Sequence, residues 1–496
     1  MTISSALSNA LSGLRANGRM AEVTANNLAN ALTPGYARQS VTLDASVTGG
    51  QGTGVAVAGV ERAIDPDLTA ARRIADGDLA EASGRLDGLA RLERALGTVE
   101  DPSSLANRVT AFEDALRTLA ETPESGPRQT AAAEAARDLA DKMNMVSTES
   151  ARVRQAADAE IARRVEEVNK ALDTIARLNR QIQIFESAGR DTAAMIDERE
   201  RLIDRVAQNV PIRVSQRPDN TVEVRTAQGL PLADTTPRKL VFSQTGSDGL
   251  ALTPPPVGAP PGTPGRDITP GGSGPQRIQG GALAGLFELR DRIVPEFEAG
   301  LDALAADLIT RTENSAADPT VAFGDYGLFT DDSGVFDPAA PGAIPTGLAR
   351  DLRVSPMVDP AVGGEPWRLR DGLNAPAEGA AVADPALIRA MLDRVSAPQP
   401  LPPTVPAQLG LTGSLSLSGR TAQIAELSAT ARVRTEAQVS ALGTTRETLA
   451  TEEGGLLGVD QDTEMQRLVQ IEQAYAANAQ VIQTAARMLD ELTRIR

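Results

Sequence analysis

The chain has 496 residues, enough for two to four domains, and 41% of them are hydrophobic, so a packed core is expected. Its 49 basic and 66 acidic residues leave a net charge of −17, and the two signs alternate along the helical stretches as on solvated helix faces. A chain of this kind is repelled by nucleic acid and by anionic membranes, so we expect neither as a partner.

Cysteine and histidine are both absent, which excludes disulfides, cysteine nucleophiles, His-based triads and His-ligated zinc. A carboxylate pair for glycan hydrolysis remains conceivable at Asp331 and Asp332, or at Asp325. Adjacent aspartates in a glycine-rich loop usually form turns, however. We therefore expect no enzyme, no cofactor and no metal site. No apolar run reaches the ~18 residues of a membrane span, and the N-terminus lacks a Sec-type signal pattern.

The N-terminal segment, residues 4–32, predicts a helix that ends at Thr33-Pro34-Gly35, because proline cannot continue the hydrogen-bond ladder. Residues 39–43 and 53–62 have the patterns of strands on either side of a Gly-rich stretch. In the helix, apolar or small residues step by three and four, as in a coiled-coil seam. They are Leu7, Leu11, Leu14, Gly18, Ala21, Ala25, Leu28 and Leu32.

The middle of the chain is also mostly helical in pattern. Residues 65–119 predict two helices broken near 97–102, and residues 128–188 predict one rod-like helix without Gly or Pro. A heptad repeat in the long helix indicates that it needs a partner helix. Its members are Ile161, Val168, Ile175 and Ile182. A further helix over 191–210 precedes a predicted β-hairpin near 211–242.

Proline and glycine dominate residues 253–275, which predicts a loop. Residues 280–314 predict a helix kinked at Pro295, and 317–410 a small, irregular Pro/Gly-rich insertion with a short helix near 385–395. A helix over 419–453 is expected to break at Gly454-Gly455 and Gly458, before a last helix that runs from 460 to the end. The last helix has its own stripe, at Leu468, Ile471, Tyr475, Asn478, Ile482, Ala485, Leu489 and Leu492.

The two end helices have no obvious partner next to them in the sequence, so the economical solution pairs them with each other. The predicted fold is mainly α with small β portions: an elongated rod of long helices, terminal helices in a coiled coil, and a small irregular or β insertion. We expect three units: a terminal unit (1–62 and 455–496), a helical rod (63–316 and 411–454) and the insertion (317–410). Two thin helices bury too little area to outweigh the entropy of ordering them. We therefore expect ends that are poorly ordered in the monomer and fold against neighbouring subunits.

The ends also resemble a known family. Residues 5–43 are similar to the N-terminus of flagellar rod, hook and hook-associated proteins, most specifically in Asn26-Asn27-Leu28-Ala29-Asn30 and Thr33-Pro34-Gly35-Tyr36. Tyr36-Ala37-Arg38-Gln39 is closer to the hook-associated members. At the other end, residues 478–485 resemble the terminal helix of the same family.

The resemblance implies a structural junction subunit between the hook and the filament of the bacterial flagellum. It implies export through the flagellar type III apparatus to the cell exterior, and a cytoplasmic chaperone that holds the C-terminal helix beforehand. The expected partners are hook protein, the next hook-associated protein and other copies of the chain. A hook or rod subunit is the alternative, which the helix-rich middle disfavours; an extracellular glycan hydrolase is a remote one.

Single residues allow two interpretations. Asn26, Asn27 and Asn30 either cap the helix end or form hydrogen bonds between subunits. Asn478 either fixes the register of the stripe or faces solvent, and Tyr36 and Tyr475 are expected to anchor packing. The residues expected to serve assembly or packing are Leu7, Leu11, Leu14, Asn26, Asn27, Leu28, Asn30, Gly35, Tyr36, Leu468, Ile471, Tyr475, Asn478, Ile482, Leu489 and Leu492.

Overall fold

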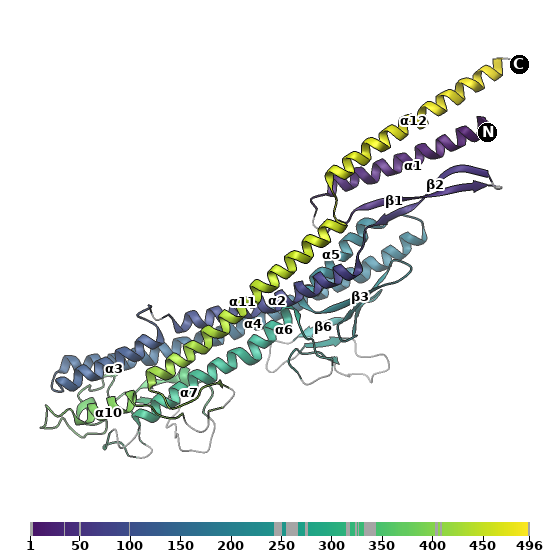
Figure 1. Ribbon diagram of the computed structural model, residues 1–496. Helices are drawn as coiled ribbons and strands as arrows, with labels where there is room; N and C mark the ends of the chain where they lie inside the picture. The colour runs from purple at the N-terminus through teal and green to yellow at the C-terminus, as the bar shows by residue number, and fades with distance from the viewer. Residues whose placement is uncertain are drawn as a thin grey trace, which may run out of the picture.

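The computed structural model describes most of residues 3–494. The residues outside this description are 34, 49–50, 99, 243–249, 254–265, 273–275, 314–317, 323–324, 326, 332–343, 402–404 and 407–408. The described residues form an elongated molecule in which long helices run along one axis, and both termini lie at the same end (Figure 1). No helix among them is both long and apolar enough to cross a membrane.

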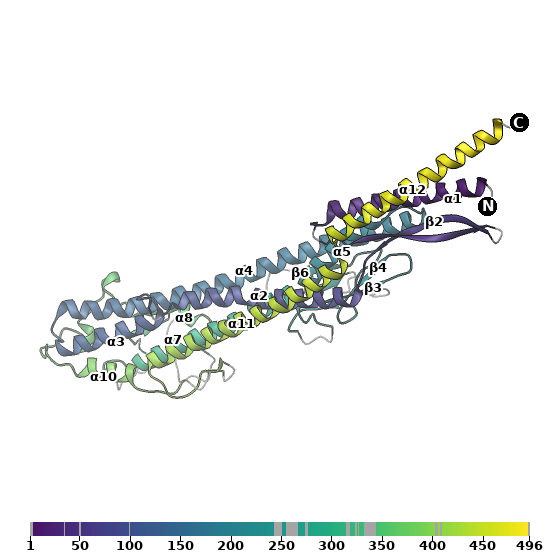
Figure 2. The same ribbon diagram turned by 45° about the horizontal axis from the view of Figure 1, so that its top comes forward.

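The ends of the chain lie together, as predicted. Helix α1 (Ile3–Asn30) runs beside α12 (Gln461–Arg494), and the antiparallel strands β1 (Gln39–Thr48) and β2 (Gln51–Arg62) lie along the other side of α1 (Figures 1 and 2). We call these four elements the terminal unit. The predicted strands are confirmed and extend further toward the hairpin tip than their pattern indicated.

The rod is built on α4 (Gly126–Ser187), a helix of 62 residues that is about 93 Å long. The isoleucine and valine positions of its predicted heptad are all buried, as a helix with a partner requires. Packed along it are α2 (Pro66–Leu96), α3 (Leu105–Glu121), α5 (Ala193–Asn209), α6 (Gly281–Glu288) and α7 (Val294–Thr312). Helix α11 (Leu417–Leu457) packs mainly on α2. Asp65 and Ser104 cap α2 and α3 by accepting amide hydrogen bonds from Leu68 and Asn107.

The predicted kink at Pro295 takes a specific form. A π-helical turn, η1 (Leu289–Ile293), separates α6 from α7, and proline follows it at the second position of α7. Proline lacks the amide hydrogen of a regular turn and its ring crowds the preceding carbonyl, so a widened turn accommodates it.

Two small antiparallel sheets lie beside the rod. The first contains the predicted hairpin, with β3 (Ile212–Gln216), β4 (Val222–Thr226) and β5 (Pro231–Ala233), and Asn220 adopts a left-handed φ of 56° at its turn. The second was not expected and contains β6 (Lys239–Phe242), β7 (Leu250–Thr253) and β8 (Arg266–Asp267). Strand β8 lies inside the segment 253–275, for which a loop was predicted. The sequence did not indicate it, because two residues are too few to show an alternating pattern. Residues 254–265 and 273–275 lie outside the described residues.

The described part of the insertion packs against the rod. Strand β9 (Phe329–Thr330) pairs with β10 (Arg353–Val354), and the short helices are α8 (Leu348–Asp351), η2 (Pro360–Val362), α9 (Arg368–Asp371) and α10 (Ala386–Ser396). The ring of Phe329 meets that of Phe112 on α3 edge to face at 5.5 Å. Residues of these elements share one hydrophobic core with α3, α4 and α7.

A buried arginine joins this segment to α7. Arg311 pairs with Asp307 at 3.0 Å and donates to the carbonyl oxygens of Arg394 and Ala397 at 2.9 and 2.8 Å. Burial raises the pKa of Asp307, while the Arg311 guanidinium opposes that rise. The carboxylate therefore depends mainly on this cation, with a smaller contribution from Arg420.

Replacing Arg311 is expected to loosen the distal end of the rod. Arg311→Met leaves the Asp307 carboxylate buried without its cation, which costs about 3–5 kcal/mol of unfolding free energy. Arg292 is exposed and pairs only with Glu288 and Glu296, so Arg292→Met should change stability by less than about 0.5 kcal/mol. Chemical denaturation of both variants measures the difference; equal stabilities would contradict the role of Arg311.

The predicted helix break is wrong at Gly454-Gly455 and confirmed at Gly458. Helix α11 continues through both glycines to Leu457, and the chain turns at Gly458, whose amide donates to the carbonyl of Gly454. A glycine costs a helix only about 1 kcal/mol, and the packing of α11 against α2 outweighs this. Asp460 then begins α12 by accepting from the amides of Asp462 and Thr463 at 2.9 and 3.1 Å.

Candidate assembly surface of the joined termini

Two contacts define how α1 and α12 are aligned. Gly13 lies opposite Asn478, so closely that a Cβ on Gly13 would come within 2.7 Å of the Asn478 Nδ2 atom. Asn27 Nδ2 donates to Glu464 Oε2 at 3.2 Å. On each helix, fourteen residues (two heptads) separate the two contacts. From the first contact to the second, the residue numbers rise on α1 and fall on α12. The two helices are therefore antiparallel and in heptad register.

The seam between the two helices is small and polar. On α12, every seventh residue faces α1, and Glu464, Ile471 and Ala485 are buried there. The buried positions of α1 are Ala10, Ala16, Asn17, Val23, Thr24 and Asn27. Asn17 Nδ2 has no hydrogen-bond partner within the described structure. Small residues let two helices approach closely, but they bury little apolar area, so this pairing is weak.

The predicted leucine stripe of α1 lies beside this seam rather than in it. Leu7, Leu14 and Leu28 are half-buried, whereas Leu11 is 44% exposed and Leu32 is 89% exposed. The stripe contains the largest apolar residues of the helix, but the buried positions are one residue away, where Ala, Asn and Thr allow close approach. Leu11 and Leu32 are thus the two leucines left largely uncovered.

The α12 stripe divides into two rows. Ile471 is buried and Asn478 half-buried against α1, as the register interpretation of Asn478 requires. In the second row Leu468 and Ile482 are half-buried, Tyr475 is 50% exposed and Leu489 is also exposed. The Leu492 side chain lies outside the described residues.

Asn27 is the centre of a buried hydrogen-bond network where α1, β1 and α12 meet. Its amide nitrogen donates to the Gln39 carbonyl at 2.8 Å, and its oxygen accepts from the Gln39 amide at 3.0 Å and from the Tyr36 hydroxyl at 2.9 Å. Glu464, fully buried, also accepts from Arg38 Nε at 2.6 Å. The Arg38 amide donates to the Leu457 carbonyl at the end of α11. This network, which we call the Asn27 network, fixes the turn between α11 and α12.

The Asn27 network makes the stability of the terminal unit sensitive to alkaline pH. Burial, followed by the charges of Asp197 and Glu464, raises the pKa of Tyr36 to about 12 from an ordinary 10. An unfolded end would lose the phenol proton near pH 10, so the stabilisation is complete below pH 10 and is lost as pH rises toward 12. Absorbance titration should show a late tyrosine step that Tyr36→Phe removes; an unchanged titration curve in that variant would contradict the assignment.

The other candidate residues at the end of α1 and in the turn after it have local roles. Asn30 Nδ2 donates to the Asn26 carbonyl at 3.0 Å and Asn30 Oδ1 accepts from the Thr33 hydroxyl at 3.3 Å, which favours the capping interpretation for Asn30. Asn26 is exposed. Gly35 has a φ of +77°, and a Cβ there would lie 2.8 Å from the Arg201 side chain. Glycine is thus needed for both its conformation and its lack of a side chain.

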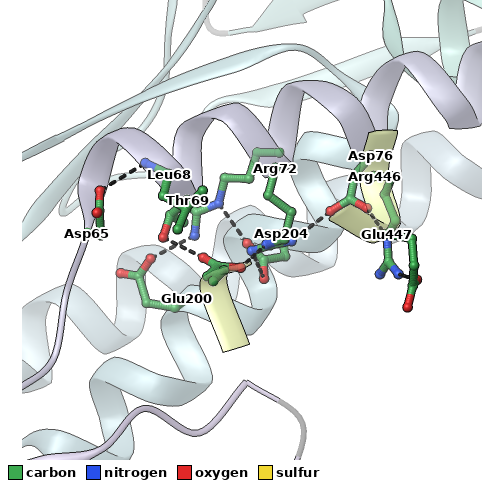
Figure 3. Close-up of polar contacts among 11 residues, drawn as sticks. Asp65, Leu68, Thr69, Arg72, Asp76, Glu200, Asp204, Arg446 and Glu447 are labelled. Atoms are coloured by element: carbon green, nitrogen blue, oxygen red, sulfur yellow. Dashed lines mark hydrogen bonds and ion pairs between the residues drawn. The ribbon is translucent and has the colours of Figure 1, made fainter. Parts of the chain in front are cut away.

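Ion pairs connect the terminal unit to the rod. Arg62 Nε contacts Asp197 at 2.7 Å in a largely buried pair, and Arg19 contacts Asp191 at 2.9 Å. Just beyond, Arg72 of α2 pairs with Asp76 on the same helix, Asp204 on α5 and Glu453 on α11, as Figure 3 shows in part. Arg73 pairs with Glu200 and Asp204. Arg446 pairs with Asp76 (Figure 3).

The sequence analysis missed these pairs, because alternating charges on a helix were interpreted as a solvated face. Three helices that are far apart in the sequence share them, so no local spacing shows the partners. Their effect is to hold α2, α5 and α11 together where the terminal unit joins the rod. A buried group that pairs with several opposite charges costs more to break than an exposed pair.

The carboxylates considered for glycan hydrolysis lie only partly within the described residues. Asp325 Oδ2 accepts from the Ala322 amide at 3.1 Å and from Asn374 Nδ2 at 2.8 Å, as in a loop-forming aspartate. Asp332 lies outside the described residues, as do most of its neighbours. The described part of the chain holds no cluster of three or more acidic groups arranged to bind a metal ion.

Comparison with known proteins adds the family. Residues 89–327 match the helical domain of the flagellar hook-associated protein FlgK, and residues 457–495 match the C-terminal domain of flagellar basal body rod FlgEFG proteins. The chain is therefore similar to flagellar hook-associated proteins in its rod and to flagellar rod proteins at its C-terminal end. The predicted resemblance to these proteins is thereby confirmed, and the matched residues include the C-terminal motif and the rod.

Two curated relatives are flagellar hook-associated protein 1. The one from Bacillus subtilis is 27% identical over 235 residues, which cover 45% of this chain and 46% of the relative. The one from Escherichia coli is 25% identical over 311 residues, covering 61% and 55%. The chain thus spans about half the length of the curated relatives it matches. The hook junction protein FlgK from Burkholderia pseudomallei aligns with a TM-score of 0.45 at 21% identity, over 54% of this chain and 47% of that one.

Proposed function

We propose that the chain is a structural adaptor subunit that connects the hook to the filament of the bacterial flagellum and acts mechanically. The observation that carries the proposal is the uncovered apolar surface on both terminal helices. An antiparallel pair with a small polar seam leaves Leu11 on α1, Leu32 just after its end, and Tyr475 and Leu489 on α12 open to solvent. Exposed apolar rows of this kind are typical of subunit interfaces.

The distribution of charge supports packing through the terminal unit. Residues 1–62 and 455–496 hold eight basic and nine acidic residues, although the whole chain has a net charge of −17. Terminal units can therefore pack side by side with little repulsion. The excess negative charge belongs to the rod and the insertion, where like-charge repulsion favours an outer, solvated position.

We further propose that the three units divide the work. The terminal unit continues the tubular core, the helical rod contacts hook protein and the next hook-associated protein, and the insertion covers the distal end of the rod. The sixteen residues expected to serve assembly or packing belong to the terminal unit. Among them Asn27, Asn30 and Ile471 hold the unit together, and the exposed leucines and tyrosine face other subunits.

Location and export follow from the same proposal. The subunit acts outside the cell after passage through the flagellar type III apparatus, and a marginal terminal unit suits that route because export requires easy unfolding. Before export, the uncovered row of α12 is an aggregation hazard. A cytoplasmic chaperone bound to α12 would cover it.

Deleting the gene tests the junction role. The proposal predicts hooks without filaments, with flagellin released into the medium. The match of residues 457–495 to rod proteins supports the alternative, a hook or rod subunit, which instead predicts loss of the hook itself. The glycan-hydrolase alternative predicts hydrolysis of cell-wall glycan by the purified full-length chain, and the adaptor proposal predicts none.

A further inference from the structure

The β1–β2 ribbon has one face on α1 and one face uncovered. Gly54 points at α1, because a Cβ there would lie 2.0 Å from Ser12 Oγ, and that oxygen accepts from the Val55 amide at 3.1 Å. Neighbouring residues of a strand point to opposite faces, so Val55 and Val57 point away from α1. Leu43 is the register partner of Val57, and the two side chains are each 40% exposed.

This outer face needs a cover. A two-stranded ribbon is marginal by itself, and burial of both faces is the usual remedy. The four positions of the face are Leu43, Ala45, Val55 and Val57, all apolar and uncharged. We call them the ribbon face. Helix α1 covers only the opposite side, and Figure 1 shows α1 lying between the ribbon and α12.

A surface that fits the ribbon face lies on the same chain. The second row of α12, Leu468, Tyr475, Ile482 and Leu489, repeats every seven residues and is uncharged. It is about 32 Å long at 1.5 Å per residue. The ribbon face is shorter, about 7 Å along each strand, so it can cover about one turn of the row. The two surfaces match in polarity, and both belong to the nearly neutral terminal unit.

We infer that the α12 row of one copy packs on the ribbon face of a second copy. This inference rests on the proposed function and names the contact through which the terminal units associate. The two surfaces are different, so the contact is heterologous: each copy uses its row on one neighbour and its ribbon face on the other. Contacts of this type extend into rings or helical tubes, whereas a self-complementary patch stops at a dimer.

Cysteine cross-linking in whole flagella tests the contact, and the absence of native cysteine leaves no competing thiol. Full-length Val57→Cys/Ile482→Cys is produced as the sole copy, and the isolated flagella are oxidised. The control is Val57→Cys/Gln470→Cys, because Gln470 is exposed on the opposite side of α12 from Leu468. Immunolabelling with an antibody to the chain establishes its presence in the flagella.

The inference predicts a ladder of covalent dimers, trimers and longer species from the Val57/Ile482 pair, and at least tenfold less cross-linking from the control. Labelled flagella with no ladder, or with dimers only, would overturn the contact and leave the proposed function standing. Flagella that form without the chain would overturn the proposed function, and the inference with it.

Discussion

Glu464→Ala is expected to release α12 from the rest of the molecule while leaving the rod folded. The substitution removes the fully buried carboxylate that accepts from Asn27 and from Arg38 at 2.6 Å. Asn27 then keeps its bonds to Gln39 and Tyr36 but loses its link to α12. The loss of a charged hydrogen-bond acceptor costs about 1–3 kcal/mol. The α1–α12 pair is only weakly stable, so a loss of even about 1 kcal/mol is enough to separate the two helices.

Hydrogen exchange followed residue by residue measures this effect. Amides of α12 and α1 should exchange at least tenfold faster in Glu464→Ala, with an intermediate effect in Glu464→Gln, and α4 should stay unchanged. Glu472 is exposed on the same helix, which makes Glu472→Ala the matched control. Equal exchange in the Glu464 and Glu472 variants would show that the Asn27 network does not hold the two ends.

Tyr475→Asp combined with Leu489→Asp is expected to abolish incorporation into flagella while leaving the rod of the isolated chain folded. The two side chains are 50% and 42% exposed in the single chain and lie outside the rod, so the stability of the rod should change by less than about 0.5 kcal/mol. In an assembly the same positions would place charges in an apolar interface, where an unpaired charge costs several kcal/mol per contact. Because the same contact would recur at every subunit of a tube, the summed cost would prevent assembly.

Filament formation and swimming in a complemented deletion strain report the outcome. Gln473→Asp combined with Gln470→Asp adds the same charge to exposed polar positions of α12 and should preserve both. Secretion of the variant into the medium needs to be measured alongside, because it separates a failure of assembly from a failure of export. Normal filaments in the Tyr475/Leu489 variant would show that this row is not an interface.

Much of the fold was predictable because its signals are local. The run without Gly or Pro and the seven-residue repeat of Ile161 and Ile175 predicted α4, and proline and asparagine marked the ends of α1 and the β3–β4 turn. The helix break at Gly454-Gly455 was wrong because the packing of α11 against α2 outweighs the local cost of glycine. The strands β6–β8 were missed because they are short and held by distant residues.

The candidate site was predicted in its position but not in its contacts. The pairing of the ends followed from two unpartnered stripes, yet the seam proved to consist of residues such as Ala10, Asn17 and Glu464. The leucines were predicted for the seam because they are large and hydrophobic. Two helices approach closely only where small residues face each other, and the positions of those residues follow from the three-dimensional register of the helices. The ion pairs of Arg72 join three separate helices, and no pattern along the chain contains that information.

The central claim is that the two ends are each other's partners, are marginally stable in the single chain, and become firmly ordered by joining other subunits. Limited proteolysis of the purified full-length monomer, compared with the same chain in isolated flagella, tests it most directly. The account predicts that residues 3–62 and 458–494 are cut rapidly in the monomer while α4 survives, and that the same regions resist protease in flagella. Equal resistance of both ends in the two states, with no tendency of the monomer to associate, would contradict it.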